Sequence, residues 1–198
     1  MKAALAALTE GADPNARDEL PQHLSLWRLI LDELRGKRHA PSTAPTALIM
    51  ALEGSAPHHP VNPTLVKALL DHGAKVNAQD SNGATPLLLA VHKGYTTTAQ
   101  MLLAHGADAN RPDASGMTPL MFALLADPGI LSCLLDHGAK VNLRDLDGWT
   151  ALNYAVTIGN MEGIKRLLDS GADINDKDKY GNPILWGVLT VRKDSKGK

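Results

Sequence analysis

The sequence predicts an all-α solenoid in which short helix pairs stack side by side. A Gly-Ala pair recurs at Gly73, Gly106, Gly138 and Gly171, at intervals of 33, 32 and 33 residues. Each period contains two short apolar segments separated by a break, and then a polar stretch of Asn, Asp and Gly. A fixed period of this length is typical of stacked supersecondary units, each too small to bury a core alone.

The chain begins with a partial unit, residues 1–15. The apolar stretch MKAALAAL leads directly into Gly11-Ala12-Asp13-Pro14-Asn15, another copy of the repeated phrase. We therefore interpret residues 1–15 as the second helix of a truncated repeat and not as a signal peptide, for which the stretch is short. This half-repeat suggests that the chain was cut from something longer.

Residues 16–77 predict one expanded repeat. Gly11 and Gly73 lie 62 residues apart, close to two periods, yet only three helical patterns occur between them, over 20–34, 46–53 and 63–71. We take the first as an inserted helix, because its apolar residues recur at helical spacing. Two roles stay open for it: packing on the neighbouring repeats, or presenting Trp27 to a partner.

The next units, 78–110, 111–142 and 143–175, are regular. In the first of them Thr85 is suited to cap a helix, and Pro86 fits the first helical turn. Gly94 breaks the chain between two antiparallel helices, and Gly106 follows the second helix, where a positive φ is usual. The polar stretch that follows predicts a hairpin leading to the next helix pair. Residues 176–198 predict a partial C-terminal capping repeat.

A long motif is repeated in register: DSNGATPL at 80–87, DASGMTPL at 113–120 and DLDGWTAL at 145–152, each followed by a Leu-Leu pair and Gly-Ala-x-x-Asn. In these residues the chain resembles the ankyrin repeat family, closely over 62–187 and as a fragment over 1–15. The resemblance implies an ankyrin solenoid of about five units. It also implies a non-catalytic protein–protein interaction module that binds a partner through its concave face and hairpin tips, without a cofactor.

The chain departs from the family pattern at the position after Thr-Pro-Leu. The family often has a histidine there, whereas this chain has Leu88, Met121, Asn153 and Trp186. We therefore expect the first turns of these helices to lack a side-chain hydrogen bond and to depend on packing.

Composition excludes several classes of function. Hydrophobic residues make up 44% and aromatic residues only 4%, so the core should be aliphatic. A net charge of −1 predicts neither nucleic-acid nor membrane binding. The single cysteine, Cys133, excludes an intramolecular disulfide and fits an intracellular compartment, cytoplasmic or nuclear. We expect a monomer.

No pattern indicates catalysis or a metal site: there is no phosphate-binding glycine loop, nucleophile elbow or paired ligand motif. The recurring residues predict structural roles instead. Histidines precede the glycines and should lie near helix carbonyls, since packed helices are about 10 Å apart and zinc ligands lie about 2 Å from the ion. The recurring Asp and Asn residues should hold the hairpins. These sets are His72, His105 and His137; Asp80, Asp113, Asp145 and Asp178; and Asn77, Asn110, Asn142 and Asn175.

The resemblance places partner contacts at hairpin tips and on first helices. The matching positions are Ser81, Asn82, His92, Lys93, Met117, Leu146, Asp147, Trp149, Ile158, Lys179 and Tyr180. Apolar members gather late in the array, and Met117 should lie beside Trp149. Two interpretations of Trp149 stay open: it covers the edge of its own repeat, or it is a binding hot spot.

An alternative function is a regulatory or targeting segment of a larger multidomain enzyme or receptor whose chemistry lies elsewhere. The full-length gene would discriminate between the two, because further domains upstream would favour this alternative.

Overall fold

A computed structural model describes residues 46–53, 61–177, 179, 181 and 183. Within these residues the chain forms eight α-helices and no β-strand, only an isolated antiparallel bridge between Lys177 and Pro183. The helices are α3 (Ala47–Glu53), α4 (Pro63–Asp71), α5 (Pro86–His92), α6 (Thr96–Ala104), α7 (Pro119–Ala123), α8 (Pro128–Asp136), α9 (Ala151–Ile158) and α10 (Met161–Asp169). The predicted all-α class is confirmed.

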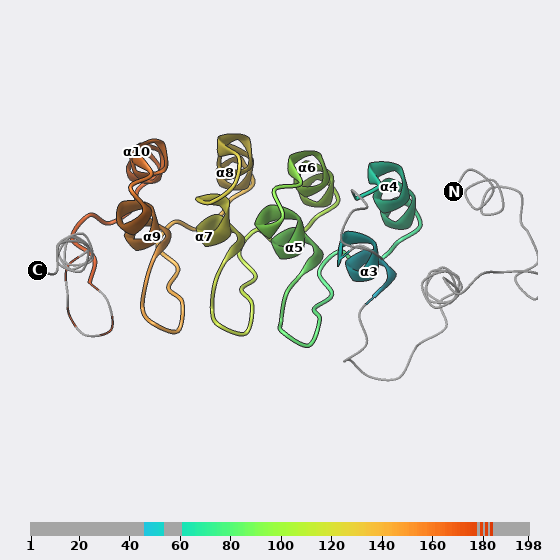
Figure 1. Cartoon of the computed structure of the whole chain (residues 1–198), viewed down its shortest axis with the longest axis horizontal. Coiled ribbons are helices and arrows are strands. Elements are labelled where there is room, and N and C mark those ends of the chain that lie inside the picture. Colours follow the sequence, from blue (N-terminus) through green and yellow to red (C-terminus); the bar gives the residue numbers. More distant parts are fainter. Residues whose placement is uncertain (1–45, 54–60, 178, 180, 182, 184–198) are drawn as a thin grey trace, which may run out of the picture.

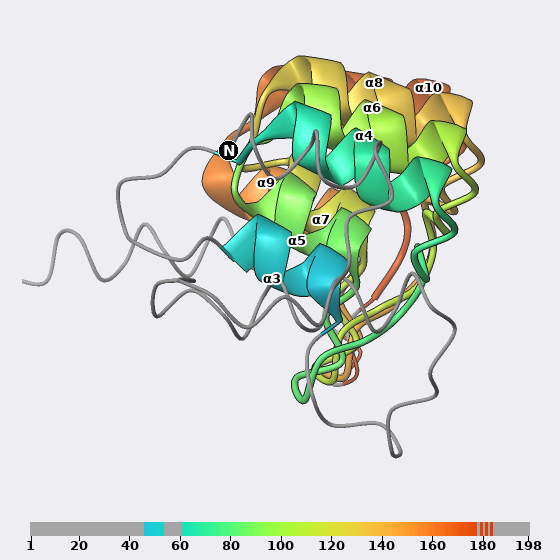
Figure 2. The ribbon, with the colours of Figure 1, turned by 90° about the vertical axis from the view of Figure 1, so that its right-hand side faces the viewer.

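The helices form two layers along one axis. The first helices of the units, α3, α5, α7 and α9, make one layer, and the second helices, α4, α6, α8 and α10, make the other (Figure 1). Helix α5 packs against α6 in its own unit and against α3 and α7 in the units on either side. Viewed along the stack, the loops between units project together beyond the first-helix layer (Figure 2). This is the predicted solenoid.

The core repeats two aliphatic positions per unit, one in each helix. In the first-helix layer Leu48, Leu87, Leu120 and Leu152 are fully buried, and in the second-helix layer Leu69, Leu102, Leu134 and Leu167 are. Each of these leucines contributes on the order of 1.5–3 kcal/mol by its burial. The core is therefore aliphatic, as the composition predicts.

Helix ends follow the expected signals. Thr85 Oγ1 accepts the N–H of Leu88 at 3.2 Å, and Pro86 is the first residue of α5. Gly94 and Gly106 have φ of +70° and +83°, in the left-handed region that glycine occupies without strain. These residues therefore fix where each helix begins and ends.

The expectation for the residue after Thr-Pro-Leu is wrong at Met121, whose Sδ accepts the Thr118 N–H at 3.4 Å, and at Asn153. The Asn153 Oδ1 accepts the Thr150 N–H at 2.9 Å and the Thr150 hydroxyl at 2.6 Å. The amide therefore supplies a side-chain hydrogen bond at this turn, whereas Leu88 at the equivalent position only packs in the core.

The expected helices over 46–53 and 63–71 are present as the packed pair α3 and α4. The partial unit 1–15, the inserted helix with Trp27, Asp178 and the last-unit helix with Trp186 lie outside the described residues. The exact unit boundaries stay predictions. No helix of the described part of the chain is long and apolar enough to cross a bilayer.

Candidate functional site

Each hairpin between units is closed by one aspartate. Asp145 Oδ1 accepts the N–H groups of Asp147 at 2.8 Å and Trp149 at 2.9 Å, and the Asp145 N–H donates to the Trp149 carbonyl at 3.0 Å. Asp80 and Asp113 hold their hairpins with the same pattern. The predicted turn-capping role is confirmed for these three residues.

Adjacent hairpins approach each other through backbone. The Leu146 N–H donates to the Ser115 carbonyl of the preceding hairpin at 3.1 Å. Between them lies Gly116, which has φ of +83° and whose missing Cβ would stand 2.8 Å from the Leu146 nitrogen. Glycine is required here by both conformation and space.

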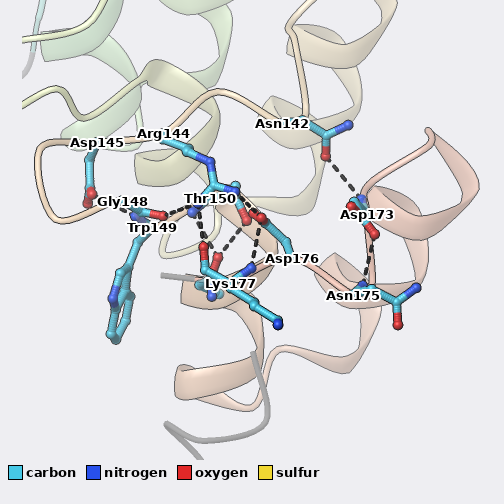
Figure 3. A network of polar contacts seen from close by, with 11 residues as sticks. Asn142, Arg144, Asp145, Gly148, Trp149, Thr150, Asp173, Asn175, Asp176 and Lys177 are labelled. Carbon is cyan, nitrogen blue, oxygen red and sulfur yellow. Dashed lines mark hydrogen bonds and ion pairs between the residues drawn. The ribbon is translucent and has the colours of Figure 1, made fainter. Parts of the chain in front are cut away.

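The recurring asparagines link successive units. The Asn110 amide donates to the Gly138 carbonyl at 3.1 Å, and its Oδ1 accepts the Lys140 N–H at 2.7 Å. Asn77 and Asn142 make the same two bonds to their next units, and Figure 3 shows Asn142 directed at Asp173. The expectation that these residues satisfy backbone groups is confirmed, with the detail that the backbone belongs to the following unit.

We predict that Asn110→Ala destabilises the chain by about 1–2 kcal/mol, because it removes two hydrogen bonds between units. Urea denaturation followed by circular dichroism measures the loss. Asn110→Asp is the control, since it keeps the acceptor for Lys140 and should lose less than the alanine. A free energy of unfolding unchanged by Asn110→Ala would contradict the linking role.

A second set of links was missed by sequence reasoning. Arg144 donates to the Gly148 carbonyl of its own hairpin at 2.9 Å and pairs with the nearly buried Asp176 of the next unit (Figure 3). Gln79 donates to the carbonyls of Gly83 at 2.7 Å and Pro112 at 3.3 Å, as Arg144 does to those of Gly148 and Lys177. The residue type at this position varies between units, so the repeated pattern did not reveal its role. The signal in the sequence was a long polar side chain two residues after the asparagine, at Gln79 and Arg144.

The first helices leave one side uncovered. Leu89, Phe122 and Tyr154 each stand four residues after the capping threonine and are half-buried between fully buried neighbours. Ile158, one turn further along α9, is 44% exposed, and Leu125, in the turn after α7, is 73% exposed. Residues four apart share a helix face, so Ile158 continues the surface of Tyr154.

Trp149 lies on this surface against its own repeat. Its ring centroid is 5.2 Å from that of Tyr154, with the planes tilted by 60°. The Tyr154 hydroxyl donates to Asp145 Oδ2 at 2.5 Å. Burial, and then this hydrogen bond, raise the pKa of Tyr154 well above its ordinary value, so the phenol stays neutral. Figure 3 shows the Trp149 indole directed away from the polar network.

We define the apolar face as Met117, Phe122 and Leu125 of the third unit with Trp149, Tyr154 and Ile158 of the fourth. The units are adjacent, since α7 packs against α9 and the two hairpins are hydrogen bonded. Sequence reasoning missed Phe122, Leu125 and Tyr154. For Phe122 and Tyr154 the signal in the sequence was their helical spacing, two residues after the buried Leu120 and Leu152.

The predicted residues of the second unit lie apart from the apolar face or have partners within the chain. Ser81 and Asn82 are exposed at their hairpin tip. The His92 ring contacts Phe122 edge-on, with centroids 5.2 Å apart, and so adjoins the face. Lys93 Nζ donates to the carbonyls of Leu52 at 3.2 Å and Glu53 at 2.9 Å, which satisfies the C-terminus of α3.

The later candidates surround the face at its hairpin end. Leu146 is 72% exposed at the tip of its hairpin. Asp147 next to it forms an ion pair with Lys179 of the following unit. Tyr180 lies outside the described residues.

The histidines before the glycines are structural, as predicted. The Nδ1 atoms of His72, His105 and His137 lie 2.7, 2.8 and 2.8 Å from the carbonyl oxygen four residues earlier. Because a carbonyl only accepts, each Nδ1 carries the proton. Among the described residues, no group of three or more His, Cys, Asp or Glu side chains is placed to hold a metal ion.

Comparison with known proteins agrees with this architecture. The family model described as ankyrin repeats (3 copies) matches residues 8–113 and 108–178. A comparison with curated proteins finds no match to the chain. The repeats of this family are in general protein–protein interaction modules and are typically non-catalytic. Helix pairs, hairpins and the family match together show that the chain belongs to the ankyrin repeat family.

Proposed function

We propose that the chain is a non-catalytic protein-binding module and that its partner binds the apolar face and the hairpin tips beside it. One observation carries the proposal: three aromatic side chains, Phe122, Trp149 and Tyr154, lie partly exposed on adjacent units. Tryptophan and tyrosine are enriched among the residues that dominate binding energy. Exposed apolar surface of this kind is typical of interaction sites.

The surface is also rigid, which favours binding. The hairpins that carry Met117 and Trp149 are held by Asp113 and Asp145, and the units are linked by asparagine and backbone hydrogen bonds. A preorganised surface loses little conformational entropy when a partner docks.

The titratable groups on the face support a binding role. Tyr154 is kept neutral by its raised pKa, so it is a poor base. Asp145 accepts hydrogen bonds on both carboxylate oxygens, from two N–H groups and the Tyr154 hydroxyl. Both groups are therefore engaged in holding the hairpin in place.

We predict that Trp149→Ala reduces partner capture by about tenfold or more, the effect of losing a binding hot spot. The measurement is affinity capture from a lysate of the source organism, with quantification by mass spectrometry. Ile174→Ser is the matched control, because Ile174 is 65% exposed but outside the apolar face. It should capture as well as the wild type. Equal capture by the folded Trp149→Ala chain would overturn the proposed site.

A further inference from the structure

The hairpin end of the apolar face is acidic. The Tyr154 hydroxyl lies 2.5 Å from Asp145 Oδ2, and after burial and this hydrogen bond, the charges of Asp145, Asp147 and Asp113 further raise the pKa of Tyr154. The aromatic pair Trp149 and Tyr154 therefore stands in a locally negative field.

Part of this charge is neutralised within the chain. Lys179 pairs with Asp147, and Arg144 pairs with Asp176. Among the described residues no cation pairs with Asp145, which is 8% exposed, or with Asp113, which is more accessible.

Asp113 differs from Asp145 in the hydrogen bonding of its second carboxylate oxygen, Oδ2. Oδ1 of both residues accepts the N–H groups of the hairpin. In the fourth unit Tyr154 donates to Oδ2 of Asp145 at 2.5 Å. Phe122 takes the tyrosine's place in the third unit and has no hydroxyl to donate. A partly accessible carboxylate oxygen without this donor is suited to accept from a cationic partner group.

We propose that the partner segment bound by the apolar face is apolar with an adjoining arginine or lysine. This rests on the proposed function. The apolar residues of the segment cover Phe122, Leu125 and Ile158. Its cation lies at the hairpin end, beside Asp113 and against the Trp149–Tyr154 pair, where charge attraction and cation–π attraction add. An acidic segment is repelled from the same place, so the field selects among apolar partners.

The test uses the whole chain of 198 residues and a random peptide library displayed on phage. Peptides are selected on the wild type, synthesised with a fluorescent label, and their dissociation constants measured by anisotropy. Each is measured against the wild type, Trp149→Ala, Asp113→Asn and Asp80→Asn. The asparagine variants keep the Oδ1 acceptor of the turn and remove the charge. Asp80→Asn is the matched control, because Asp80 has the same turn role in the second unit.

We expect selected peptides to combine apolar residues with arginine or lysine and to lose affinity in Trp149→Ala. Asp113→Asn should weaken their binding by about two- to fivefold, as expected for a partly exposed charge pair, and Asp80→Asn should not. Replacing the peptide's basic residue by glutamine should abolish the effect of Asp113→Asn.

Two other results overturn the inference in different ways. Peptides that require Trp149 but contain no basic residue, or bind Asp113→Asn as tightly as the wild type, refute the cationic partner and leave the proposed function standing. If no selected peptide depends on Trp149, both the cationic partner and the proposed site fail.

Discussion

Gly116→Ala is expected to destabilise the chain by about 2–5 kcal/mol. The first part is conformational: φ at Gly116 is +83°, and an alanine in the left-handed region costs about 1–2 kcal/mol. The second part is steric. The new Cβ would stand 2.8 Å from the Leu146 nitrogen and 2.9 Å from the Asp145 Cα, and overpacking of this kind costs about 1–3 kcal/mol. Backbone atoms cannot rotate away, so the two hairpins must separate.

Gly106→Ala separates the two contributions. Gly106 has the same φ of +83°, but no heavy atom lies within 4 Å of the position of its missing Cβ. It should therefore lose only the conformational part, about 1–2 kcal/mol. Urea denaturation of both variants gives the comparison. Equal losses would mean that the close approach of the hairpins contributes nothing to stability.

The fold was predictable because the repeated residues act locally. A capping threonine, a left-handed glycine or a turn aspartate has the same effect wherever it recurs, and Thr85, Gly106 and Asp113 are found in those roles. The errors are at positions where one unit differs from the next. Asn153 supplies a hydrogen bond that was not expected, because the prediction considered only the absence of the family's histidine at this position.

The candidate site was predicted only in part. Hairpin positions such as Met117, Leu146 and Trp149 were found because they follow the repeated aspartate. Phe122 and Tyr154 were missed because they differ from Leu89 and from each other, and only burial distinguishes an outer helix position from a core one. Lys93, a predicted partner contact, is exposed, but its ammonium group donates to two carbonyls of α3, a contact that the sequence did not predict. Contacts between units cannot be inferred from the sequence of one repeat.

We expect Leu134→Ala to destabilise the chain by about 2–5 kcal/mol, the range for a fully buried leucine that leaves a cavity. Leu134 is 0% exposed in α8, the second helix of a middle unit, which packs against α6, α7 and α10. In a solenoid each unit contacts only its neighbours, so stability depends on the units themselves and on the interfaces between adjacent units. The loss should therefore weaken the coupling of the units on both sides, and the single urea transition should broaden or split.

Leu125→Ala is the control for this prediction and also tests the apolar face. Leu125 is 73% exposed, so its loss should change the free energy of unfolding by less than about 0.5 kcal/mol. It belongs to the apolar face, however, so it should still weaken binding of a peptide selected on that face. A large stability loss with Leu125→Ala would show that the side chain packs within the fold. Unchanged stability with weaker binding would separate the residues that build the stack, such as Leu134, from those that it presents to a partner.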